Sequence, residues 1–222
     1  MYYIKIGTDT YGRVKAVSGT SIVTKFAMVN FLPLYPLESY YSFGTGEKKS
    51  QGVPLTRLDY ASVAVAYLRG VFGTLAVFGS ISFFSFVMWL LNQRFDEFAQ
   101  YATWFLLACL VVGIIGGTLT YLIPNTSRRE RTIRECCGEI VGVAVDPALV
   151  QAEFAQALAD YAKDVEYESA VVHPKFADKG QFAMAKEMLQ VRVEIALGNT
   201  DPVLERRTDE LIERLPQSMA VA

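Results

Sequence analysis

The residues best suited to chemistry in this 222-residue chain are few. Glu135 and Glu139 are four positions apart, so on a helix their carboxylates would share one face, as the ligands of a carboxylate-bridged metal site do. Such a site also needs Glu-x-x-His pairs from neighbouring helices, and His173 is the single histidine of the sequence. We therefore interpret the two glutamates as a solvated acidic face and predict no metal site.

The three cysteines and His173 point to no catalytic site. Cys109 lies in an apolar run, and Cys136 and Cys137 are adjacent, a spacing that suits neither an ordinary disulfide nor a zinc knuckle. The adjacent pair is open to two interpretations, which are S-palmitoylation near a membrane and, more favoured, burial in an amphipathic helix. His173 has neither an orienting carboxylate nor a nucleophile motif beside it, so we expect a surface-loop residue.

The segment 44–50 has the glycine, lysine and serine content of a phosphate-binding loop. It lacks the four residues that such a loop needs between its glycines, and no strand-then-helix pattern surrounds it. We interpret residues 44–57 as a flexible basic linker. The sequence therefore predicts no catalytic residue, no cofactor-binding residue and no cofactor.

Two long uncharged runs, 70–91 and 101–123, occupy the middle of the chain. At about 1.5 Å per residue, each is long enough to cross a hydrocarbon core of about 30 Å. Two such helices buried inside a soluble protein of this size would leave little polar surface to cover them. We therefore predict a transmembrane helical hairpin over residues 58–124, with Arg69 reaching to the membrane interface.

Cations flank the two runs unevenly. Several precede the first run and several follow the second, whereas Arg94 alone lies in the connection. The positive-inside rule then places both termini in the cytoplasm, and Trp89 and Trp104 fall at the connecting-loop ends, where an aromatic belt belongs. The cations that follow the second run form a juxtamembrane cluster, and we predict that it contacts anionic lipid headgroups at about 1 kcal/mol per residue: Arg128, Arg129, Arg131 and Arg134.

The regions outside the hairpin differ in pattern. Residues 1–43 are rich in β-branched and aromatic residues punctuated by glycine, which predicts a small β-rich N-terminal unit. Within it, residues 26–37 are apolar but too short and proline-rich to span a bilayer. They either close a small β core or lie against the membrane surface, with Phe31 and Tyr35 at headgroup level.

Residues 125–222 are predicted to form an α-helical cytoplasmic domain. Apolar residues recur there at helical spacing, and Asp146, Asp178 and Asp201 each stand where a capping residue would begin a helix. The fold class predicted for the whole chain is a mainly α integral membrane protein. It combines a two-helix transmembrane hairpin with a small N-terminal β-rich unit and a helical C-terminal cytoplasmic domain.

Small residues mark a helix-packing seam. Gly113 and Gly117 are four apart in the second run, a spacing that lets helix backbones approach closely in lipid, and Gly70 stands in a comparable stripe of the first run. We predict that Gly113 and Gly117 face the first helix of the same chain. The alternative is a seam between two copies of the chain.

The chain has a basic front and an acidic back, with a net charge of +4 over residues 1–69 and −5 over residues 124–222. Neither part is basic enough to predict nucleic-acid binding. We predict a membrane-anchored scaffold or accessory subunit of a membrane protein complex, without catalytic activity of its own, whose partners are the lipid bilayer, other membrane-complex proteins and a second copy of itself. A membrane-bound enzyme with a site between the soluble parts and a helper subunit of a transporter are the alternatives. We expect a bacterial inner membrane as the location.

Overall fold

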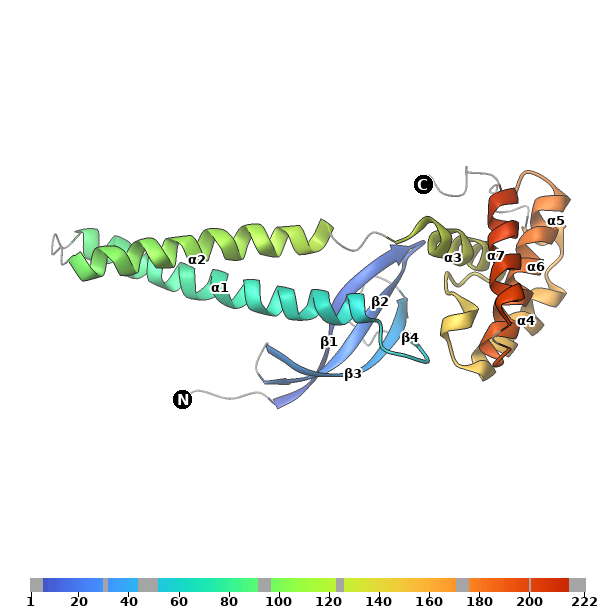
Figure 1. The fold of residues 1–222 in the computed structure, drawn as a ribbon, viewed down its shortest axis with the longest axis horizontal. Helices are drawn as coiled ribbons and strands as arrows, with labels where there is room; N and C mark the ends of the chain where they lie inside the picture. Colours follow the sequence, from blue (N-terminus) through green and yellow to red (C-terminus); the bar gives the residue numbers. More distant parts are fainter. Residues whose placement is uncertain are drawn as a thin grey trace. The chain divides into compact units, whose positions relative to one another are not determined.

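The structure is a computed structural model that describes residues 6–29, 32–43, 52–91, 97–122, 126–170, 176–199 and 201–215. The predictions for His173, Phe31 and residues 44–51 of the linker lie outside these ranges. The chain forms two units (Figure 1). Unit 1 comprises Met1–Arg13, Thr24–Leu37 and Asp59–Asn125, and unit 2 comprises Val14–Val23, Glu38–Leu58 and Thr126–Ala222.

A four-stranded sheet runs in the order β1-β2-β3-β4. Its strands are β1 (Ile6–Val17), β2 (Thr20–Val29), β3 (Leu32–Phe43) and β4 (Gly52–Pro54). Strand β4 pairs antiparallel with β3, with Val53 opposite Tyr41, and both side chains are buried. The linker predicted over residues 44–57 is therefore corrected at residues 52–54, because an apolar residue there completes a strand pair.

Gly12 lies inside β1. Its φ of +73° is in the left-handed region, and a Cβ atom there would overlap the carbonyl oxygen of Ser62. Ser62 is fully buried, donates a hydrogen bond to the Gly12 carbonyl oxygen at 2.7 Å and accepts one from the Thr24 hydroxyl at 2.9 Å. The glycine thus allows the sheet and the helix that carries Ser62 to approach closely.

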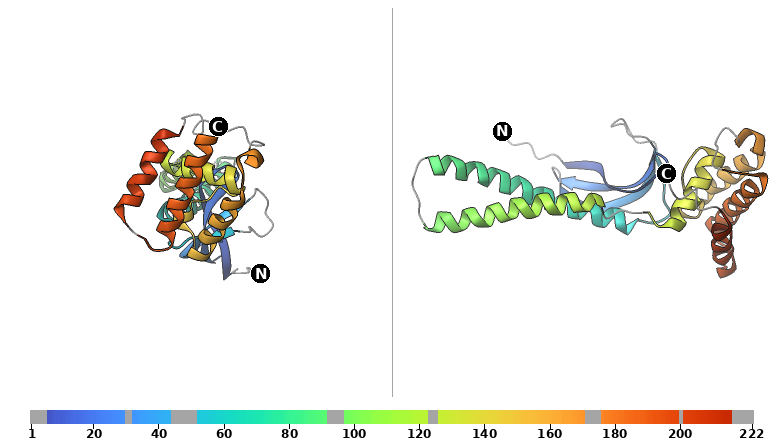
Figure 2. Two further views of the ribbon diagram at one scale, coloured as in Figure 1. Left: turned by 90° about the vertical axis from the view of Figure 1, so that its right-hand side faces the viewer. Right: turned by 90° about the horizontal axis from the view of Figure 1, so that it is seen from above.

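Two long helices of unit 1, α1 (Tyr60–Leu91) and α2 (Glu97–Leu122), run side by side in opposite directions (Figures 1 and 2). Asp59 caps α1, since its Oδ1 accepts a hydrogen bond from the Ser62 backbone amide at 2.8 Å. Both helices are long and apolar enough to cross a membrane, over the segments Tyr60–Met88 and Trp104–Leu122. The predicted helical pair is therefore present, with its first helix beginning where Asp59 satisfies the exposed amides.

The first turns of α1 pack against the sheet residues of unit 1. Phe26, Met28 and Ala66 form a buried cluster, and the Tyr67 ring meets the Phe26 ring edge-on at 5.6 Å between centroids. One face of the opening part of α1, with Ser62, Val65 and Ala66, is therefore buried, whereas Tyr60, Tyr67 and Leu68 on its other faces are exposed.

Unit 2 contains the remaining helices, which Figure 2 shows from two sides. They are α3 (Arg128–Val141), the 3-10 helix η1 (Pro147–Leu149), α4 (Ala152–Asp164), α5 (Tyr167–Ala170), α6 (Lys179–Ala196) and α7 (Pro202–Arg214). Side-chain oxygens of Asp146, Asp178 and Asp201 cap η1, α6 and α7, which confirms the helix starts predicted at Asp178 and Asp201. The start predicted at Asp146 is corrected, because Asp146 caps only the three-residue 3-10 helix η1 and α4 begins separately after Gln151.

The helices of unit 2 also contact strand and loop residues of the N-terminal third. Leu55 forms an isolated antiparallel bridge with Val150, and the Thr56 amide donates to the Leu149 carbonyl oxygen at 2.9 Å. Residues 14–23 and 38–58 belong to this unit. The division predicted at residues 43 and 125 is therefore corrected, because the C-terminal helices satisfy backbone groups of the first 58 residues.

Candidate functional site

The character of α1 changes at Arg69 and Gly70. Before this point, Val65 and Ala66 are buried against the sheet; after it, large apolar side chains such as Phe78 and Phe84 are exposed. The exposed set continues along both helices and includes Val71, Val77, Ile81, Phe83, Phe105, Val112, Ile114, Ile115 and Leu119. Unit 1 therefore has a sheet-packed end and an apolar, uncovered end.

Arg69 binds the end of α2. Its Nε donates to the Thr120 hydroxyl at 3.3 Å, its Nη2 donates to the Thr120 carbonyl oxygen at 3.4 Å, and its guanidinium lies 4.2 Å from the centre of the Tyr121 ring. A cation is stabilised at a helix C-terminus, where carbonyl oxygens lack helical partners. Arg69 thereby joins α1 to the C-terminal end of α2. This contact lies at the point along α1 where the helix leaves the sheet.

Aromatic residues occur at two levels of the helical pair. Tyr121 is exposed beside Arg69, and Tyr101 and Trp104 are exposed near the opposite end of α2. At about 1.5 Å per residue, Trp104 and Tyr121 are separated by about 26 Å, close to the thickness of a hydrocarbon core of about 30 Å. This spacing is typical of the two aromatic belts of a membrane-spanning segment.

The glycine seam between α1 and α2 differs in detail from the predicted one. A Cβ on Gly113 would lie 2.6 Å from the Ala76 nitrogen, and one on Gly79 would lie 2.6 Å from the Leu110 Cβ. Gly116, absent from the predicted set, lies directly on the Phe72 ring. Gly117 has only the Phe72 Cβ at 4.0 Å, so its contact is an ordinary one.

The placement of Gly70 in this seam is corrected. A Cβ on Gly70 would meet Pro33 of β3, with 3.1 Å to the Pro33 Cδ, rather than an atom of α2. The reason is rotational position, because each residue turns the helix by about 100° and Gly70 points toward the sheet.

Replacing Gly113 with leucine is expected to destabilise the helical pair by about 1–3 kcal/mol, because the new side chain meets the α1 backbone, which cannot rotate away. The matched control is Gly117→Leu, which adds the same side chain where there is room and should have a much smaller effect. Thermal unfolding of the full chain in mild detergent measures both. Equal destabilisation by the two variants would contradict the assigned seam.

Arg134 is the most deeply buried charged residue in the part of unit 2 that the structure describes. It is 0% exposed, and its guanidinium donates to the carbonyl oxygens of Lys15 (2.5 Å), Thr20 (2.9 Å) and Ala144 (3.1 Å). It also lies 5.0 Å from the centre of the Tyr41 ring. The predicted contact of Arg134 with lipid headgroups is wrong, because three backbone acceptors and the ring enclose the whole cation.

A second buried cation, Arg192, holds the centre of an ion-pair network. Its Nε and Nη2 donate to the two carboxylate oxygens of Asp146 at 2.9 and 2.7 Å, and its Nη1 lies 3.1 Å from both carboxylate oxygens of Glu205. Arg129 also binds Glu205, and its Nε donates to Asp209 at 2.6 Å. The network thus joins α3, η1, α6 and α7 through fixed charges.

The four arginines predicted to contact lipid therefore differ in their burial and in their partners. Arg134 is buried, and Arg129 is committed to Glu205 and Asp209. Arg128 is exposed and Arg131 is partly exposed. For Arg128 and Arg131, contact with headgroups stays a prediction.

Burial and charge shift the pKa values around this network. Burial raises the pKa of the Tyr41 hydroxyl well above its usual range, and the Asp146 carboxylate raises it further. Burial alone would lower the pKa of Arg192, but the hydrogen bonds and charge of Asp146 outweigh it and raise the pKa. Tyr41 is thus neutral and Arg192 charged, so the network offers fixed charges rather than a group that exchanges protons near neutral pH.

The cysteines of α3, Cys136 and Cys137, are both buried. Desolvation raises the pKa of the Cys137 thiol to about 12. These positions agree with the favoured interpretation, burial in an amphipathic helix, and leave little access for an acylating enzyme while the unit is folded.

Cys137 is therefore expected to resist thiol reagents in the native protein. With its pKa raised to about 12, the thiol is almost entirely protonated at about pH 8, and the sulfur is also enclosed. Labelling with a maleimide, read by mass spectrometry, should be slow in the folded chain and complete after denaturation. Fast labelling of native Cys137 would show that the site opens readily.

Sequence reasoning missed the roles of Arg192, Tyr41 and the Arg69 contact with Thr120. A signal for Arg192 was present, because it lies three residues after Leu189 and seven after Ala185 on the apolar face of α6. A charged residue at a core position of a helical pattern predicts a buried ion pair. Nothing in the sequence indicated which acidic residue would be its partner.

Among the residues that the structure describes, no three His, Cys, Asp or Glu side chains are grouped so as to hold a metal ion. Comparisons with protein families, curated proteins and solved structures gave no match for this chain. The arrangement of the described residues offers two chemical features. They are an apolar helical pair bounded by aromatic and cationic residues, and a helical unit locked by buried ion pairs.

Proposed function

We propose that this chain is a membrane-anchored scaffold or accessory subunit of a membrane protein complex. The α1–α2 pair crosses the bilayer as a hairpin, and unit 2 is presented to protein partners in the cytoplasm. The observation that carries the proposal is the uncovered apolar surface of the pair. Only 6% of the most apolar stretch of α1 and 11% of that of α2 are buried within the structure.

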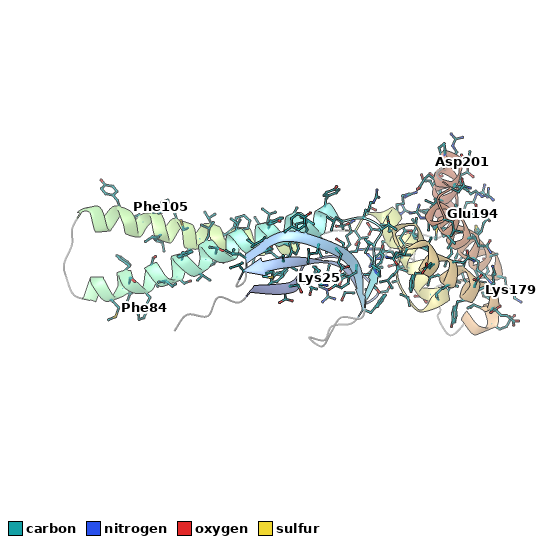
Figure 3. All side chains as sticks on the ribbon, turned by 90° about the horizontal axis from the view of Figure 1, so that it is seen from below. Lys25, Phe84, Phe105, Lys179, Glu194 and Asp201 are labelled. Atoms are coloured by element: carbon teal, nitrogen blue, oxygen red, sulfur yellow. The ribbon has the colours of Figure 1, made fainter. Side chains whose placement is uncertain are left out.

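Exposure of this extent favours lipid as the surrounding medium. In water, soluble proteins rarely expose contiguous apolar patches of more than a few hundred Å². The side chains of Phe84 and Phe105, labelled in Figure 3, belong to this surface and are exposed. A helix whose backbone bonds are satisfied internally is one of the two structures that can cross a bilayer.

The level of Arg69 supports a membrane boundary at the sheet-packed end of the hairpin. Arg69, Tyr121 and Thr120 meet there, and the aromatic pair Tyr101 and Trp104 lies near the other end of α2. Cations are concentrated before α1 and after α2, so the positive-inside rule supports a cytoplasmic position for both termini. We propose the inner membrane of a bacterium as the location.

The ordered ion-pair network supports a binding role for unit 2. Arg134 and Arg192 fix α3, α6 and the strand residues of this unit by hydrogen bonds that leave few alternative arrangements. A preorganised surface loses less conformational entropy when a partner binds. Unit 2 is thus suited to bind a partner through a surface whose conformation changes little.

Affinity purification of the full chain from mild detergent tests the proposal. We expect a partner at near-stoichiometric amount. The Arg134→Ala variant should stay in the membrane fraction but bind much less of the partner, because unit 2 is destabilised while the hairpin remains; Arg128→Ala, which replaces an exposed arginine of the same helix, should keep the partner. A wild-type chain that purifies alone, or a partner retained by the Arg134→Ala variant, would contradict a scaffold acting through unit 2.

A further inference from the structure

We propose that the first half of β3, residues 32–37, is a second membrane contact and lies in the lipid interface beside the hairpin. The proposal rests on the proposed function, because it needs α1 and α2 to cross the bilayer. The occupant of this surface is lipid at the level of the headgroups and the upper acyl chains. It resolves the two alternatives left open by the apolar segment 26–37.

The two halves of that segment behave differently in the structure. Phe26 and Met28 at the end of β2 are buried in the core of unit 1. In β3 the large apolar side chains are exposed instead, with Leu34 at 57% and Tyr35 at 66%. Leu32 and Leu37 are exposed as well, so four of these six residues carry an exposed apolar side chain.

The same residues form an open edge of the sheet. Strand β4 pairs with β3 at Tyr40–Ser42, and among the described residues it does not extend along 32–37. An exposed, apolar edge strand is an aggregation hazard in water, and Pro33 and Pro36 reduce that hazard by removing two backbone donors. The exposed side chains of this edge are nevertheless apolar, so contact with lipid is more favourable for them than contact with water.

Two contacts fix the depth of this edge against α1. A Cβ on Gly70 would lie 3.1 Å from the Pro33 Cδ, and the Tyr67 hydroxyl donates to the Leu34 carbonyl oxygen at 2.9 Å. Both contacts are within two residues of Arg69, which binds Thr120 and covers the Tyr121 ring. The edge therefore lies at the level where the exposed apolar surface of α1 begins.

The chemistry of the edge favours lipid over a protein partner. Residues 32–37 carry no charge, and they contact α1 at Tyr67 and Gly70, just before its exposed apolar side chains from Val71 onward. Tyr35 has the amphipathic side chain that is enriched at membrane interfaces. An open edge cannot enter the hydrocarbon core, where its free backbone groups would lack water, so the strand is placed in the hydrated interface.

Tryptophan fluorescence in vesicles tests this placement. In a full chain with Trp89→Phe and Trp104→Phe, a single tryptophan is introduced as Tyr35→Trp, Phe84→Trp or Tyr161→Trp, all at exposed positions. The vesicles contain phosphatidylcholine and phosphatidylglycerol, with part of the lipid brominated near the top of the acyl chains. We expect Tyr35→Trp to be quenched about twofold, because interfacial segments lie about 5–10 Å into the headgroup and acyl boundary.

The control positions separate the outcomes. Phe84→Trp, in the membrane-spanning part of α1, should also be quenched, and Tyr161→Trp, on α4 of unit 2, should not. Quenching of Phe84→Trp without quenching of Tyr35→Trp would overturn the proposed interfacial contact of β3, whether water or a protein covers the strand. The proposal that α1 and α2 cross the membrane would still stand. Absence of quenching at both positions would overturn the proposed membrane function itself.

Discussion

Replacing Arg134 with leucine is expected to lower the free energy of unfolding of unit 2 by about 3–5 kcal/mol. The side chain is fully buried and donates to the carbonyl oxygens of Lys15, Thr20 and Ala144. Each of these acceptors would lose its partner inside the protein, and each such loss costs about 1–3 kcal/mol. The acceptors belong to β1, β2 and the segment after α3, so one substitution loosens three parts of unit 2.

The labelling rate of Cys137 measures this effect directly, because the thiol is buried on the same helix and reacts only when unit 2 opens. A loss of about 3–5 kcal/mol should raise that rate by about a hundredfold or more. Arg128→Leu is the matched control, since Arg128 is exposed on α3 and should leave the rate nearly unchanged. Similar rates for the Arg134→Leu variant and the wild type would contradict a structural role for the buried cation.

Replacing Arg192 with leucine is the second large change, with an expected loss of about 3–5 kcal/mol in the free energy of unfolding of unit 2. The Asp146 carboxylate receives two hydrogen bonds from Arg192 and is itself buried. Without Arg192, the Asp146 carboxylate would be an unpaired charge inside the protein. Leaving that charge unpaired costs more free energy than the intact ion pair contributes to stability. Glu205 would lose one of its two partners but would keep Arg129, and it is half exposed and can be solvated.

A double-mutant cycle separates this penalty from lost packing. The Asp146→Ala, Arg192→Leu double variant removes both charges, so it should be destabilised by less than the two single variants add up to. Asp146 also caps η1, and the loss of that cap should cost about 1 kcal/mol in either background. Strict additivity, measured by hydrogen exchange of α6 and α7 in the full chain, would show that the two residues are not coupled.

The elements predicted well were those that local rules define. An uncharged run of 22 residues from Gly70 to Leu91 allows a long apolar helix, and Asp178 and Asp201 begin helices because their side chains bind the exposed amides of the first turn. Such features depend on residues within about four positions of one another. Their recognition therefore required no knowledge of the fold.

The features that were missed depend on distant partners. Arg134 follows an apolar run together with three other arginines, and that pattern indicates topology rather than burial. Two of its three acceptors, Thr20 and Lys15, are 114 and 119 residues away in the sequence, in strands whose pairing was not predicted. Strand β4 is three residues long and has no pattern of its own, since its place depends on β3.

The glycine seam shows what the spacing of small residues can predict and what it cannot. Gly113 and Gly117 satisfy the small-xxx-small pattern, but the pattern does not fix how the second helix is rotated about its axis. In the structure Gly113 and Gly116 lie against Ala76 and Phe72, whereas Gly117 is farther from the seam. A rotation of about 100° separates neighbouring residues, so the choice between Gly116 and Gly117 needs the partner helix.

We propose that α1 and α2 cross a membrane as a hairpin with unit 2 in the cytoplasm, and cysteine accessibility in intact cells is a direct test of this topology. In a full chain with Cys109→Ser, Cys136→Ala and Cys137→Ala, a single cysteine is placed at Gln93, which lies outside the described residues, or at Lys179, which begins α6. With a maleimide that cannot cross the membrane, we expect labelling of Gln93→Cys in intact cells and labelling of Lys179→Cys only after lysis. Labelling of Lys179→Cys from outside, with or without labelling of Gln93→Cys, would contradict this topology.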